Sequence, residues 1–157
     1  RKKLIYTLSI LFLIFTTSCG FKVVNQSEIS NFNISEIQTS GNKHINFKLK
    51  NKLQVYSKKD DARLMKINLK TSKNKTVKEK NIKNEITKYD ISISVNIKAS
   101  LINSSKEFTF AVSKSGNYNV SDRHSITLRN EKKLIELLTE NISSEIIYEL
   151  RTRIDDL

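Results

Sequence analysis

The longest regular pattern in the sequence is an alternation of apolar and polar residues between positions 89 and 101. A period of two is that of a β-strand with one face buried and the other in water. The seven apolar positions are Tyr89, Ile91, Ile93, Val95, Ile97, Ala99 and Leu101. The chain must therefore build a sheet with one covered face, and its other segments must supply partner strands and the cover.

Three further segments are predicted as strands. Residues 108–112 alternate after a turn at 103–106, which favours an antiparallel hairpin with the long strand. The Gly116–Asn117 pair predicts a turn directly after that hairpin. Residues 62–71 also alternate, and residues 31–37 are a weaker candidate for a first strand.

Two segments have helical periodicity. In the first, residues 42–57, apolar side chains recur at spacings of four, four and three. In the second, they recur every fourth residue from Leu134 to Ile154, and the helix should begin between Ser121 and Glu131, with Ser121 or Asp122 as its cap. We predict an α+β domain over residues 31–157, in the order β-α-β-β-β-α. Two helices should pack on one face of a mostly antiparallel four-stranded sheet.

The stretch between residues 71 and 88 is strongly basic. It can be a long hairpin tip, an extension of the flanking strands or a mobile loop. Lysine ammonium groups are good point-charge partners for phosphate. The alternative interpretation is an ordinary solvated surface in a lysine- and asparagine-rich chain. The candidate phosphate-binding residues are Lys73, Lys75, Lys78, Lys80 and Lys83.

The N-terminus has the layout of a bacterial secretion signal. Three positive charges precede the apolar stretch 4–15, and small residues then lead to Cys19, the only cysteine. A stretch of twelve residues is shorter than the roughly 20 that span a bilayer. We predict a signal peptide over 1–18, lipidation at Cys19 and a tether over 19–30. An ordinary cleaved signal that leaves a free thiol, and a permanent membrane helix, are the alternatives.

Several classes of site have no support in the sequence. One cysteine cannot form a disulfide within the chain, and His44 and His124 are its only histidines. With three glycines the chain has no glycine-rich phosphate loop. We therefore expect no metal, no cofactor and no enzymatic activity. Without the signal peptide the net charge falls from +12 to +9, and export makes nucleic acid an improbable partner for that charge.

Three segments resemble LptE, the small lipopolysaccharide-assembly lipoprotein family of Gram-negative outer membranes. They are Cys19–Lys22, similar to the start of alphaproteobacterial members, the hairpin 89–112, and the Tyr-Asn segment Asn117–Asp122. The resemblance implies a non-enzymatic protein anchored to the outer membrane through Cys19, facing the periplasm and the lumen of a β-barrel. Its partners would be that barrel, LptD, which it plugs and helps to assemble, and lipopolysaccharide.

The same resemblance assigns roles to two sets of residues. The five candidate lysines would contact lipopolysaccharide, and Tyr118 would contact the barrel. Local packing of the Tyr118 ring, with a hydrogen bond from its hydroxyl, is the structural alternative. An adaptor or accessory subunit of another envelope transport machine is the alternative function.

Overall fold

The computed structural model describes residues 32–56, 63–102 and 104–155. The predicted signal peptide, Cys19 and the tether lie outside these residues and stay predictions. The described elements are β1 (Phe32–Gly41), α2 (Lys43–Leu53) with a 3₁₀ turn at Gln54–Tyr56, β2 (Arg63–Lys80), β3 (Ile86–Leu101), β4 (Glu107–Asn119) and α3 (His124–Asp155).

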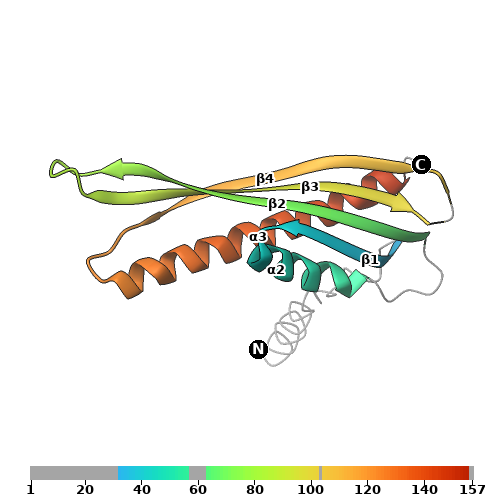
Figure 1. The fold of residues 1–157 in the computed structure, drawn as a ribbon, viewed down its shortest axis with the longest axis horizontal. Coiled ribbons are helices and arrows are strands. Elements are labelled where there is room, and N and C mark those ends of the chain that lie inside the picture. The colour runs from blue at the N-terminus through green and yellow to red at the C-terminus, as the bar shows by residue number, and fades with distance from the viewer. Residues whose placement is uncertain (1–31, 57–62, 103, 156–157) are drawn as a thin grey trace, which may run out of the picture.

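The four strands form one sheet in the order β1-β2-β3-β4. β1 runs parallel to β2, whereas the β2–β3 and β3–β4 pairs are antiparallel. Both helices lie on the same side of this sheet, with α3 running along most of its length (Figure 1). The predicted α+β class, element order and placement of the helices are confirmed. None of the helices in the described ranges is long and apolar enough to span a bilayer.

The core lies between the inner face of the sheet and the two helices. In β3 the side chains from Ile91 to Ala99 that alternate inward are all buried, as the period of two predicted. On α3 the buried stripe includes Ile142, Ile146 and Leu150, each fully inaccessible. Burying an isoleucine or leucine side chain contributes roughly 1.5–3 kcal/mol. The match of the two stripes therefore holds α3 against the sheet.

The connection between β1 and α2 depends on one glycine. Gly41 has a φ of 94°, and a Cβ built there would lie 1.9 Å from the carbonyl oxygen of Thr71. The next residue, Asn42, caps α2 by accepting a hydrogen bond from the amide of Ile45 at 3.1 Å. The buried hydroxyl of Thr71 donates to the side-chain oxygen of Asn46 at 2.7 Å. These contacts fix where α2 begins relative to the sheet.

The basic stretch 71–88 is mostly strand. β2, predicted to end near residue 71, continues to Lys80, and β3 begins at Ile86, so the chain reverses in a short turn. Of the three alternatives, the extension of the flanking strands is the one observed. Alternation alone did not reveal the extension because lysines occupy the first two inward positions beyond Thr71, at residues 73 and 75.

The predicted turn at Gly116–Asn117 is wrong. Both residues lie inside β4, where Gly116 pairs with Ile91 and Asn117 with Asp90. A Cβ at Gly116 would lie 2.8 Å from a methyl carbon of Leu134 on α3. This glycine therefore provides room for a close approach of helix and sheet, not for a reversal of the chain.

Candidate functional site

The candidate site is a hairpin arm formed by residues 72–88. β1 ends opposite Thr71, so beyond that point β2 pairs only with β3. β4 stays paired with the other side of β3 as far as Lys88, and the end of the β2–β3 hairpin extends past the first turns of α3 (Figure 1). The arm carries all five candidate lysines, and its contacts divide them into three groups.

Lys73 and Lys75 form the root of the arm and face the helix. They continue the inward alternation of Met65, Ile67 and Leu69. The ammonium group of Lys75 donates to Glu131 on α3 at 2.7 Å, and that of Lys73 lies 3.8 Å from the same carboxylate. Their charges are therefore directed at α3 rather than at solvent.

Two tyrosines complete the root. The ring of Tyr118 stacks on that of Tyr89, with centroids 5.7 Å apart, and its hydroxyl donates to Glu131 at 2.8 Å. The Lys75 ammonium lies 4.3 Å from the centroid of the Tyr89 ring, within cation–π range. Tyr118 is 6% exposed and lies in β4 rather than in a turn before the helix. Its ring and hydroxyl are engaged as the local-packing alternative expected.

The electrostatics of the root favour the charged ion pair. Burial alone would raise the pKa of Glu131, but hydrogen bonds from Lys75 and Tyr118, with the lysine charges, lower it below the ordinary 4.5. Burial likewise opposes the charge of Lys75, yet its contacts with Glu131 and Tyr118 raise the pKa above 10.5. Burial, together with the Glu131 carboxylate, raises the pKa of Tyr118. The root is thus charged across the neutral range.

The positive charge in the middle of the arm is balanced by nearby carboxylates on β2 and β3. Lys78 lies 3.3 Å from Asp90, and Lys88 lies 2.6 Å from Glu79. These pairs join β2 to β3 across the ribbon. All four side chains are well exposed to water, so each pair contributes little to stability.

The tip, residues 80–84, is built around Asn81. The side-chain oxygen of Asn81 accepts hydrogen bonds from the amides of Lys83 at 2.9 Å and Glu85 at 3.0 Å. Its backbone amide donates to the carbonyl of Glu85 at 2.9 Å. Asn84 takes the left-handed conformation, with a φ of 64°, which asparagine tolerates better than most residues. The turn is therefore fixed by its own hydrogen bonds.

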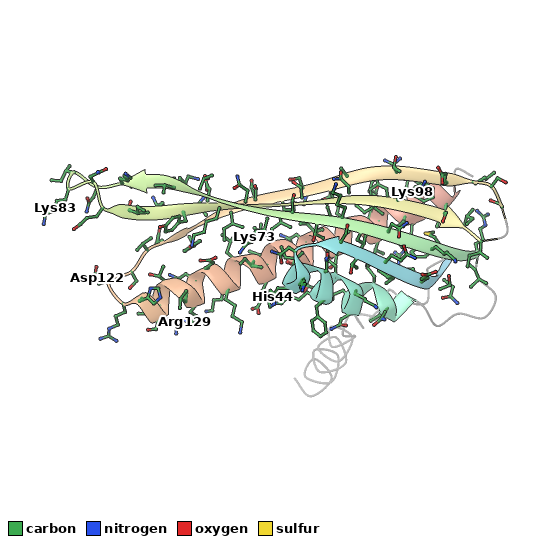
Figure 2. The ribbon with its side chains drawn as sticks, in the orientation of Figure 1. His44, Lys73, Lys83, Lys98, Asp122 and Arg129 are labelled. Atoms are coloured by element: carbon green, nitrogen blue, oxygen red, sulfur yellow. The ribbon has the colours of Figure 1, made fainter. Side chains whose placement is uncertain are left out.

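Lys80 and Lys83 are the two candidate lysines without a carboxylate partner in the described part of the chain. Lys80 donates to the side-chain oxygen of Asn84 at 2.9 Å, and Glu85 accepts instead from the Asn81 amide group. Figure 2 shows Lys83 at the free end of the arm, and Lys73 well back from it. The structure therefore separates the five lysines instead of gathering them into one cluster.

Sequence reasoning did not identify three residues in or beside the arm as part of the candidate site. Sequence reasoning gave Glu131 no role, and it treated Tyr89 as one of the seven apolar positions of the long strand. Ile82 lies at the tip with its side chain fully exposed. Ile82 could have been noticed in the sequence, because it is an apolar residue inside a polar, lysine-rich stretch. No local signal pointed to Glu131, because its partner Lys75 is 56 residues away.

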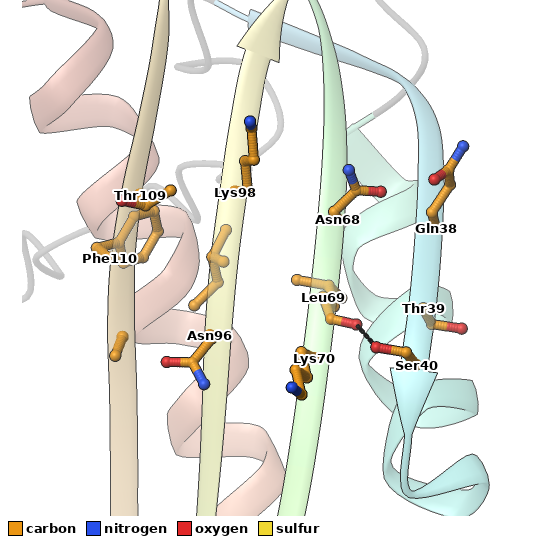
Figure 3. Close-up of a pocket in the computed structure, with 12 residues that line it drawn as sticks. Gln38, Thr39, Ser40, Asn68, Leu69, Lys70, Asn96, Lys98, Thr109 and Phe110 are labelled. Carbon is orange, nitrogen blue, oxygen red and sulfur yellow. Dashed lines mark hydrogen bonds between the residues drawn. The ribbon is translucent and has the colours of Figure 1, made fainter.

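A second surface lies on the sheet face that carries no helix. A shallow depression of about 580 Å³ is lined there by strand residues (Figure 3). Its side chains include Gln38, Asn68, Asn96 and two lysines, Lys70 and Lys98. Lys98 pairs with Glu107 at 2.9 Å. This face offers hydrogen-bond donors and acceptors over a broad, open area, as a polar contact surface requires.

Neither histidine forms part of a site. His44 on α2 and His124 at the start of α3 are both exposed. Within residues 32–56, 63–102 and 104–155, no group of three or more histidine, cysteine, aspartate or glutamate side chains is placed to hold a metal ion.

Comparison with solved structures identifies the fold. Rare lipoprotein B from Shewanella oneidensis superposes with a TM-score of 0.60 at 13% identity, covering 77% of this chain and 97% of that one. Lipoprotein B from Nitrosomonas europaea gives a TM-score of 0.61 at 10% identity, covering 87% and 93%. A minor lipoprotein from Acinetobacter baumannii gives 0.53 at 9% identity, covering 77% and 93%.

At these identities the likeness establishes a shared fold, and it spans most of both chains in each comparison. No protein-family profile matches this sequence, and no curated protein matches it.

Proposed function

We propose that this chain is an outer-membrane lipoprotein of lipopolysaccharide assembly, anchored through Cys19. The observation that carries the proposal is the fold, which is shared along most of the chain with bacterial lipoproteins of three genera. The signal-like N-terminus with its single cysteine supports the anchor independently. In this proposal the protein has no enzymatic activity and works by binding.

The proposed protein partner is the β-barrel LptD, whose lumen the domain occupies and whose assembly it assists. The elongated domain and the polar, helix-free face of its sheet support this role, because the inside of a wide barrel is polar and water-lined. A lipid tether keeps plug and barrel on one membrane surface and so raises their effective concentration.

The proposed ligand is lipopolysaccharide, bound through its phosphates at the arm. The contacts within the arm rank the candidate lysines. Lys80 and Lys83 have no competing carboxylate, and Lys78 has only an exposed one. Lys73 and Lys75 are engaged with Glu131. Lys80 and Lys83 therefore carry the proposed phosphate contacts, and the root holds the arm in place.

A charge-matched pair of double variants tests the assignment. The full chain with K80Q and K83Q should bind lipopolysaccharide about 10-fold more weakly, and with a smaller dependence on salt, while its melting temperature is unchanged. The chain with K73Q and K75Q loses the same charge but should keep most of its affinity and melt lower. Equal losses of affinity in the two variants would show that total charge, rather than the arm tip, determines binding.

A further inference from the structure

Ile82 at the arm tip is the most exposed large apolar residue in the described part of the chain. Its exposed fraction is 104%, against 67% for the next, Phe47 on α2. It touches no core residue, so the fold gains nothing from its apolar character. Turn positions of this kind usually carry glycine, asparagine, aspartate or serine. The turn chemistry is already supplied by Asn81 and Asn84.

The side chain is presented by a hydrogen-bonded turn between two lysines. The amide and side-chain hydrogen bonds of Asn81 fix the backbone around Ile82. Lys80 and Lys83 stand on either side of it in the sequence, and neither has a carboxylate partner among the described residues. An apolar point flanked by ammonium groups is complementary to an anionic amphiphile, whose phosphates lie directly above its acyl chains.

We infer that the arm tip inserts Ile82 among the acyl chains of lipid A while Lys80 and Lys83 contact its phosphates. This inference rests on the proposed function and deepens it, because it adds an apolar contact to the phosphate contacts. A single aliphatic side chain is too small to hold the protein on a phospholipid bilayer. Stable binding to a bilayer requires the apolar face of a helix or two lipid chains.

The absence of tryptophan from the sequence gives a direct test. I82W places a unique fluorophore at the tip, and I102W places one at the opposite end of the sheet, where Ile102 is 42% exposed. The full-length variants are reconstituted in phosphatidylcholine nanodiscs. They are then mixed with vesicles of bromine-labelled phosphatidylcholine that contain diphosphoryl lipid A, phosphatidylglycerol or neither.

The inference predicts that lipid A vesicles quench the tryptophan at position 82 and shift its emission to the blue, and that the tryptophan at position 102 is unaffected. Equal quenching by phosphatidylglycerol vesicles would overturn the assignment to lipid A in favour of a general anionic membrane. Absence of quenching at position 82 in all three mixtures would overturn insertion itself.

Affinity measurements separate this inference from the proposed function. I82S should weaken binding to lipid A about 10-fold, whereas I82L should bind as the natural chain does. Both variants should melt at the same temperature as the natural chain, because the side chain is outside the core. If I82S binds normally while K80Q with K83Q does not, the phosphate contacts stand and the apolar contact is refuted. If neither change affects binding, the proposed ligand site is wrong as well.

Discussion

Glu131 is the residue that joins the hairpin arm to the body of the domain. Its carboxylate accepts hydrogen bonds from Lys75 and Tyr118 and lies within 3.8 Å of Lys73. It is also the least exposed carboxylate among the ion pairs of the described residues, at 17%. Interactions of a half-buried charge with several donors are worth more than those of surface pairs.

Replacing Glu131 by glutamine should destabilise the domain by about 1 kcal/mol at neutral pH, because it removes the charge but keeps an acceptor for Tyr118. The folded state lowers the pKa of Glu131, so its contribution is present above the ordinary 4.5 and is lost as pH falls through the lower, folded value. Urea unfolding should therefore show a difference between E131Q and the natural chain that disappears in acid.

The matched control is E136Q, which removes an exposed ion pair with Lys48 on α2. Its effect at neutral pH should be a few tenths of a kcal/mol at most. An equal cost for the two variants would contradict the central position assigned to Glu131.

The two described glycines should respond differently to alanine. G41A places a Cβ 1.9 Å from a backbone oxygen at a φ of 94°, so it should cost about 3 kcal/mol or more. G116A meets the methyl group of a leucine side chain at 2.8 Å, which can move, so about 1 kcal/mol is expected. Chemical denaturation of both variants checks the order, and a reversed order would contradict the packing described around β1 and α2.

At the scale of elements, the periodicity of apolar residues in the sequence correctly predicted the strand β3 and the helix α3. The alternating apolar residues of β3 and the four-residue spacing on α3 are both buried stripes. The extension of β2 into the arm was not predicted, because Lys73 and Lys75 occupy inward positions where an apolar residue is expected. Their partner Glu131 is also distant in sequence. Gly116 was misread because a glycine that admits a helix and a glycine that turns a chain look alike in sequence.

The lysines of the arm lie on a strand that has one free edge. Beyond Thr71, one edge of β2 pairs with no strand, and the arm carries Lys73, Lys75, Lys78 and Lys80 along this edge. Lysines and register irregularities on a free edge oppose pairing with another chain. Two such irregularities occur near Val77 and Glu79. The charge of this element therefore opposes edge-to-edge pairing with another chain.

Hydrogen exchange should distinguish an ordered arm from a loop. Amides of residues 73–77 that pair with β3 should be protected, whereas a mobile loop would exchange within the dead time. E131Q should accelerate exchange in the arm and leave residues 63–71 unchanged, since those are held by the core. Uniform acceleration across β2 would instead indicate that Glu131 stabilises the whole domain rather than this element.

At the scale of the molecule, the start of β1 and the arm tip lie at opposite ends of the domain. Phe32, the first described residue, pairs with Arg63 at the start of β2, and the arm tip follows the other end of the same strand. The 18 residues of β2 span about 60 Å. The proposed anchor, Cys19, is 13 residues before Phe32. In the proposed function, this length lets the tip contact a ligand well away from the membrane surface to which Cys19 is anchored, as a plug that meets its ligand inside or beyond a barrel requires.

The most direct test of the central claim is to purify the full chain gently from its native type of envelope and to identify by mass spectrometry what accompanies it. We predict recovery from the outer membrane with a large β-barrel protein in near-equal amount, with lipopolysaccharide, and with acyl groups on Cys19. Recovery of the chain alone, or with subunits of an inner-membrane transporter and an unmodified Cys19, would contradict it.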